Sequence, residues 1–146
     1  MENEKKITWI LRIAMFATFL GHGILAVMQK KHFIDMFVGM GALVGWTVPT
    51  ATASSFVLWI GVLDILVAVA ILWKPLRVFL IWGVFWAFMT AVARPLATHG
   101  WNFGIAFTDP NSDGMMDFVE RFGNFLVPLA LLYIRGFPKT FKEWFE

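Results

Sequence analysis

Long apolar stretches separated by short polar segments dominate the pattern of this chain. Four windows reach or approach the roughly 20 apolar residues that an α-helix needs to cross a bilayer. They cover residues 7–29, 53–73, 76–96 and 118–135. The pattern therefore predicts an all-α integral membrane protein, folded as a four-helix bundle that forms a single domain over residues 1–146.

The segment between the first two windows is apolar but too short to cross a membrane. Residues 33–46 follow the polar triplet Lys30, Lys31 and His32, contain three glycines and end shortly before Pro49. A stretch of this length is typical of a helix that lies in the membrane interface or folds back into it. We expect a short interfacial or re-entrant helix between spans one and two.

Composition supports the membrane interpretation and excludes several other classes. Hydrophobic residues make up 59% of the chain and charged residues only 15%, whereas soluble domains carry about 25% charged residues. The absence of cysteine excludes disulfides, thiolate catalysis and iron–sulfur ligation. The net charge of +2 is too small for a nucleic-acid footprint. The expected partner is the lipid bilayer, with no nucleic acid.

The basic residues predict the orientation of the chain. Four crossings place both termini on one side, and basic residues favour the cytoplasmic side. Eight basic residues are expected on the side of the termini: Lys5, Lys6, Arg12, Lys74, Arg77, Arg135, Lys139 and Lys142. Four are expected on the other side: Lys30, Lys31, Arg94 and Arg121. The bias predicts cytoplasmic termini.

Two charged residues fall inside predicted spans on the side of the termini. A charge at membrane depth is costly, so each one calls for a partner or a function. Asp64 shares a helical row with Gly61 and Ala68, and such small residues mark a face that approaches neighbouring helices closely. We expect Arg12 to pair with Asp64, and favour a structural role for the pair over a proton or substrate path.

A second polar group is expected in the outer half of the bundle. Arg94 follows a stripe of small residues in span three, and Glu120 and Asn124 share one face of span four. Glu120 is the expected partner of Arg94. His22, between two glycines in span one, is placed in the same layer. The pattern predicts an outward-opening polar pocket formed by His22, Arg94, Glu120 and Asn124.

The role of His22 stays open at this point. A lone imidazole is more often packed with one hydrogen bond than used as a ligand, but together with His99 it suggests either a quinone headgroup or a haem. His99 precedes Gly100 in a predicted loop, which is a poor place for a rigid axial ligand. Haem is therefore disfavoured, and quinone is the cofactor that this pocket suggests.

Residues 109–120 fit the twelve-residue calcium loop D-x-[DN]-x-[DN]-G-x5-E at every required position. Hard cations prefer oxygen ligands, and Gly114 permits the sharp bend that such a loop needs. The expected ligands are Asp109, Asn111, Asp113, the Met115 carbonyl, Asp117 through water, and Glu120. The alternative, which we favour, is a solvated turn that caps span four, with Asp117 at the helix N-terminus.

Three stretches carry a resemblance over nearly the full chain. They are Leu11–Arg12 with Gly21–Gly23, the segment Gly61–Asp64, and residues 117–125 followed by residues 127–131. With these features the chain resembles the DoxX-like family of small four-helix membrane proteins. The resemblance implies an integral protein, expected in the bacterial inner membrane, and a polar bundle core formed by Arg12, Asp64, Arg94, Glu120 and Asn124.

The resemblance also implies possible functions for the chain. Some members of the DoxX-like family act as membrane subunits tied to quinone-linked oxidation of sulfur compounds or to redox-stress complexes. The first hypothesis is a subunit or accessory protein of a larger respiratory or redox assembly, without catalytic activity of its own. The alternatives are a quinone-binding oxidoreductase subunit in which His22 relays a proton, and a small oligomeric carrier for an anionic solute drawn to Arg94. Other membrane subunits or further copies of the chain are the expected partners.

Overall fold

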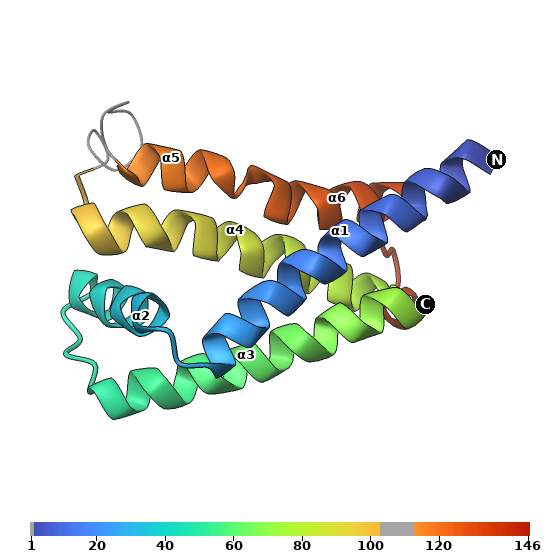
Figure 1. The fold of residues 1–146 in the computed structure, drawn as a ribbon. Coiled ribbons are helices and arrows are strands. Elements are labelled where there is room, and N and C mark those ends of the chain that lie inside the picture. Colours follow the sequence, from blue (N-terminus) through green and yellow to red (C-terminus); the bar gives the residue numbers. More distant parts are fainter. Residues whose placement is uncertain (1, 103–112) are drawn as a thin grey trace.

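A computed structural model describes residues 2–102 and 113–146, and these residues fold into helices joined by short connections (Figure 1). The elements are α1 (Glu2–Val27), α2 (Lys31–Leu43), α3 (Thr50–Trp73), α4 (Arg77–His99), α5 (Asp113–Glu120), α6 (Phe122–Arg135) and the short 3₁₀ helix η2 (Lys142–Phe145). The all-α prediction is confirmed for this part of the chain.

Three helices in the described part of the chain are long and apolar enough to cross a membrane: α1, α3 and α4. The expected fourth span, residues 118–135, is not one helix, because the segment is divided between α5 and α6. The division falls at Arg121, where φ is −89° and ψ is 0°. Around it the backbone forms tight turns, with Arg121 N–H bonded to the Phe118 carbonyl and Asn124 N–H bonded to the Arg121 carbonyl.

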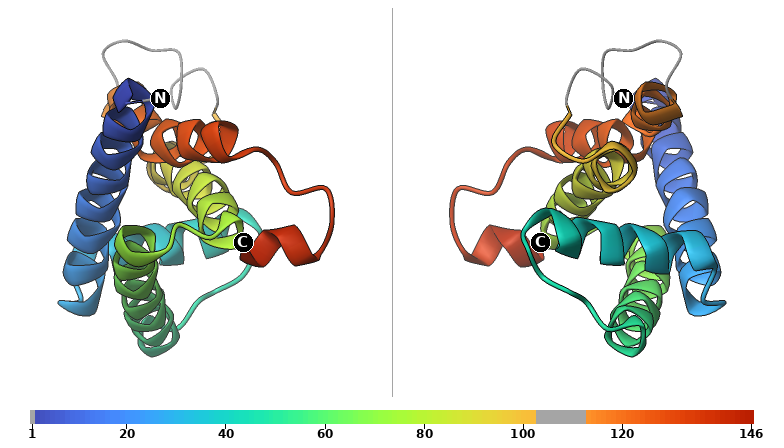
Figure 2. Two further views of the ribbon diagram at one scale, coloured as in Figure 1. Left: turned by 90° about the vertical axis from the view of Figure 1, so that its right-hand side faces the viewer. Right: turned by 90° about the vertical axis from the view of Figure 1, so that its left-hand side faces the viewer.

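The helices are arranged as two antiparallel pairs with one helix lying across their end. Helix α1 packs along α3, and α4 packs along α6. The beginning of α1 and the C-terminus lie at the same end of the bundle (Figure 1). Helix α2 runs crosswise at the opposite end, where it contacts α3 and α4 (Figure 2).

Glycines allow α1 and α3 to approach closely. A Cβ at Gly61 would lie 2.8 Å from the Gly23 carbonyl oxygen and 2.8 Å from the Val27 nitrogen, and a Cβ at Gly23 would lie 2.8 Å from the Gly61 carbonyl oxygen. Real Cβ atoms do not approach backbone this closely, so the crossing requires glycine on both helices. Toward α4, Met15 and Phe19 complete a core with Leu80.

Arg12 joins α1 to the end of α3, but not through Asp64. Its Nε donates a 2.9 Å hydrogen bond to the Ile71 carbonyl, and its Nη2 donates to the carbonyls of Leu72 and Trp73. The expected Arg12–Asp64 pair is therefore not formed. The last carbonyls of a helix have no partner within the helix and carry partial negative charge, so they attract a guanidinium directly.

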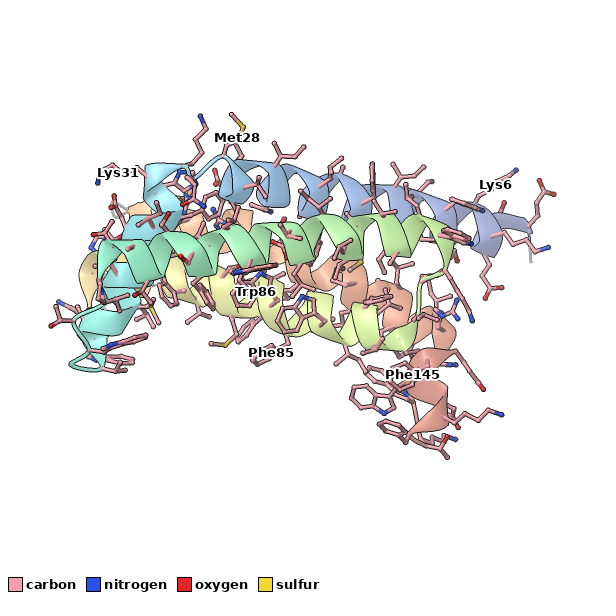
Figure 3. The ribbon with its side chains drawn as sticks, turned by 90° about the horizontal axis from the view of Figure 1, so that it is seen from below. Lys6, Met28, Lys31, Phe85, Trp86 and Phe145 are labelled. Atoms are coloured by element: carbon pink, nitrogen blue, oxygen red, sulfur yellow. The ribbon has the colours of Figure 1, made fainter. Side chains whose placement is uncertain are left out.

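Arg77 likewise donates hydrogen bonds to backbone carbonyls, in this case at the end of α6. Its Nε and Nη2 each donate a 2.8 Å hydrogen bond, to the carbonyls of Gly136 and Arg135, and its Nη1 donates to the Glu143 carbonyl at 3.2 Å. These bonds tie the start of α4 to the end of α6 and to the tail that carries η2. Figure 3 shows Phe145 on this tail, projecting from the bundle.

The outer surface of the long helices is strongly apolar. Its most exposed large side chains include Trp59, Leu66, Trp73, Phe85 and Tyr133, and Figure 3 shows Phe85 on the outer side of α4. Large contiguous apolar surfaces are rare on soluble monomers. Together with the three long apolar helices, this surface indicates an integral membrane protein in contact with the lipid bilayer.

Candidate functional site

A cavity of about 230 Å³ lies between α1, α2, α3 and α4 and reaches the start of α6. Most of its lining is apolar. The aliphatic, methionine and aromatic residues are Phe19, Ala26, Phe33, Met36, Phe37, Met40, Phe56, Val57, Ile60, Trp86, Ala87, Met89 and Ala93. The polar residues are Thr18, His22, Asp64, Thr90, Arg94, Arg121 and Asn124. An apolar cavity with a few polar groups is the usual form of a small-molecule site.

Helix α2 supplies a large share of the apolar wall. Phe33 and Phe37 are four residues apart, as are Met36 and Met40, so all four fall on one side of the helix. Phe37 stacks on Phe56 of α3, with ring centroids 4.1 Å apart and planes inclined by 15°. The crosswise helix therefore closes the cavity with aromatic rings and flexible thioethers.

Three of the four residues expected in an outer pocket line this cavity: His22, Arg94 and Asn124. They come from α1, α4 and α6, so the fold brings together residues that are distant in the sequence. Thr18, one turn before His22 on α1, lines the cavity as well. A neutral imidazole carries one hydrogen-bond donor and one acceptor.

Glu120, the fourth expected residue, is exposed and does not line the cavity. Arg94 pairs instead with Asp117, with 3.2 Å between Nη1 and Oδ1. Residues three apart in a helix share a face, so Asp117 and Glu120 were close alternatives as partners of Arg94. The cavity instead receives Arg121, whose Nε is buried without a hydrogen-bond partner among the described residues.

The two arginines make this end of the cavity electropositive. His32, on α2 outside the long helices, has its pKa lowered by partial burial and then by the positive charges of Arg94 and Arg121. Asp117 offsets part of this charge through its ion pair with Arg94. Donor groups of Arg94, Arg121 and Asn124 are therefore available to an oxygen atom on a bound molecule.

Asp64 lies deeper, near the middle of α3, and is the buried charged residue of the described core, with 5% of its surface exposed. The indole of Trp86 is its polar neighbour. One carboxyl oxygen, Oδ1, is buried without a hydrogen-bond partner among the described residues. Trp86 in turn stacks on Trp82, with centroids 5.5 Å apart, and lies on the bundle side of α4 (Figure 3).

The calcium pattern falls largely outside the described residues. Asp109 and Asn111 lie in the undescribed segment, and the side chains of Asp113 and Met115 are not described either. The remaining two expected ligands are in different environments. Asp117 forms an ion pair with Arg94, whereas Glu120 is exposed. Within residues 2–102 and 113–146, no group of three or more acidic or histidine side chains is placed to hold a metal ion.

His99 is the last residue of α4 and not part of a loop. It does not line the cavity that contains His22. Its Nε2 is buried without a hydrogen-bond partner in the described part of the chain. The two histidines that suggested a haem clamp therefore do not face a common space.

Several cavity residues were not anticipated from the sequence. In the sequence the four α2 residues stand out only as part of a short apolar helix, although their spacing of three and four marks a single face. Thr18 lies four residues before His22, so the same spacing places both on one side of α1. No spacing in the sequence places Arg121 at the cavity, because its position depends on the break between α5 and α6.

No protein-family model, curated protein or solved structure matches this chain.

Proposed function

We propose that this chain is a DoxX-like integral membrane protein that binds the headgroup of a quinone in the cavity and serves as a non-catalytic subunit of a redox assembly. The observation that carries the proposal is the cavity itself, which combines an aromatic and thioether wall with few polar side chains. Its volume of about 230 Å³ exceeds the roughly 150 Å³ that holds a benzene molecule. A substituted single ring fits this space, and its isoprenoid tail would extend into lipid.

The polar residues suit the two oxygens of a quinone. Quinone carbonyls accept hydrogen bonds, and Arg94, Arg121 and Asn124 supply donors at one end of the cavity. The stacked rings of Phe37 and Phe56 offer an aromatic surface for the ring. A carrier for anionic solutes receives less support, because Asp117 offsets part of the positive charge at Arg94.

The same proposal includes four crossings of the membrane, with α5 and α6 together forming the fourth. Helix α6 alone has 14 residues, fewer than the roughly 20 that a crossing needs. Helix α5 precedes it with only Arg121 between them and extends the segment along α4 (Figure 1). Helix α2 is then an interfacial helix on the outer side, and both termini are cytoplasmic.

Quinone binding can be tested by filling the cavity. Ala93→Trp places an indole in the space, so we expect the purified variant to retain at least ten-fold less co-extracted quinone than the native protein. Titration with decylubiquinone in detergent should show the same loss of affinity. The measurement is the quinone content of organic extracts, together with the dissociation constant from the titration.

Ala17→Trp is the matched control, because Ala17 lies on the exposed side of α1 and does not line the cavity. This variant should bind quinone like the native protein. Native protein that neither carries quinone from its membrane nor binds decylubiquinone would contradict the proposed function. Recovery of stable partner subunits from the native membrane would support the assembly role.

A further inference from the structure

The carboxyl of Asp64 forms no ion pair with a cationic side chain of residues 2–102 or 113–146. Arg12, the partner that the sequence suggested, donates its hydrogen bonds to the carbonyls at the end of α3. Asp64 nevertheless has only 5% of its surface exposed. A buried polar atom without a partner costs free energy, and inside a membrane it most often marks a functional site. The position of Asp64 therefore needs an explanation other than helix pairing.

The cavity provides that explanation. Asp64 lines it, and Oδ1 is the carboxyl oxygen that lacks a partner among the described residues. Eight residues of α4 separate Trp86, beside Asp64, from Arg94, which corresponds to about 12 Å along the helix. Asp64 thus lies at the opposite end of the cavity from the arginines. A molecule in the cavity can give this carboxyl the hydrogen bond that the described residues do not supply.

The chemistry of Trp86 limits what that molecule presents. An indole N–H can only donate, so the Asp64 carboxyl can act toward Trp86 only as an acceptor. Toward a ligand the carboxyl either accepts from a hydroxyl, as a carboxylate, or donates to a carbonyl, when it is protonated. Both cases require an oxygen function on the ligand. A pure hydrocarbon would leave the carboxyl unsatisfied.

We infer that Asp64 is a ligand-binding residue that forms a hydrogen bond with the ring oxygen of the quinone or quinol that enters the cavity most deeply. This inference rests on the proposed quinone site and assigns its inner end. The carbonyl or hydroxyl on the opposite side of the ring would then form hydrogen bonds with the polar residues near Arg94. Asp64 is assigned no catalytic step, because it binds and orients the ring.

The inference is tested by titrating the full-length protein in detergent with decylubiquinone. Asp64→Leu should weaken binding by at least ten-fold, whereas Asp64→Asn, which keeps a hydrogen-bonding group, should weaken it by a smaller factor. Asp35→Asn is the matched control, because Asp35 is an exposed residue of α2 outside the cavity. Its affinity should equal that of the native protein.

A spectroscopic measurement covers the case in which Asp64→Leu does not fold. Adding decylubiquinone should change the infrared absorption of one carboxyl group in the native protein and in Asp35→Asn, but not in Asp64→Asn. Native-like affinity of Asp64→Leu, or the same infrared change in Asp64→Asn, would overturn the inference and leave the quinone site intact. Absence of binding to the native protein would overturn both.

Discussion

Gly61→Leu is expected to force α1 and α3 apart and to destabilise the fold by more than about 3 kcal/mol, above the usual cost of overpacking. The first side-chain carbon alone would lie 2.8 Å from two backbone atoms of α1 and 2.9 Å from the Ala26 Cβ. Backbone atoms cannot rotate away as a side chain can, so the helices must separate. The change should appear as a lower midpoint of thermal unfolding in detergent, with aggregation on size-exclusion chromatography.

Gly21→Leu provides the control on the partner helix. Nothing lies within 4 Å of a Cβ built at Gly21, and leucine is a better helix former than glycine. This variant should be as stable as the native protein or slightly more stable. Native-like stability of Gly61→Leu would show that the close crossing of α1 and α3 does not hold the bundle together.

Arg12→Leu is expected to destabilise the protein by about 2 kcal/mol, a typical value for charged hydrogen bonds. It removes the guanidinium that binds the carbonyls of Ile71, Leu72 and Trp73. Arg12→Lys should recover part of the loss, because an ammonium still suits the negative end of α3. Chemical or thermal unfolding in detergent measures these differences.

A double mutant separates the two possible roles of Arg12. If Arg12 served Asp64, combining Arg12→Leu with Asp64→Asn would cost much less than the sum of the single changes. Because Arg12 binds backbone carbonyls instead, the two effects should add within about 0.5 kcal/mol. A coupling above about 1 kcal/mol would indicate that the two side chains do interact.

The long helices could be predicted because a membrane crossing demands a continuous apolar run. Expected residues 53–73 and 76–96 agree closely with α3 and α4. The first helix begins earlier than expected, at Glu2, where a Glu2–Lys6 ion pair one turn apart supports its charged start. The division of the last segment was missed, because hydropathy does not respond to a single residue with turn geometry.

The partners of charged residues were harder to predict. Arg12 binds backbone carbonyls, which every residue possesses and which leave no mark in a sequence. Arg94 had two acidic candidates on one helix face, and only the path of α5 selects Asp117. The sequence pattern predicts different layers for Asp64 and His22, whereas in the structure Gly23 packs against Gly61 and Ile65. That contact places His22 and Asp64 at similar depth, so both line one cavity.

The stacked indoles of Trp82 and Trp86 give the protein a built-in optical signal. Two identical chromophores with centroids 5.5 Å apart couple their electronic transitions, and the resulting circular dichroism couplet depends on how the two rings are oriented relative to each other. Trp86 borders the cavity and Trp82 does not. Anything that shifts Trp86 therefore alters the couplet, and occupancy can be followed in the unlabelled native chain despite its six other tryptophans.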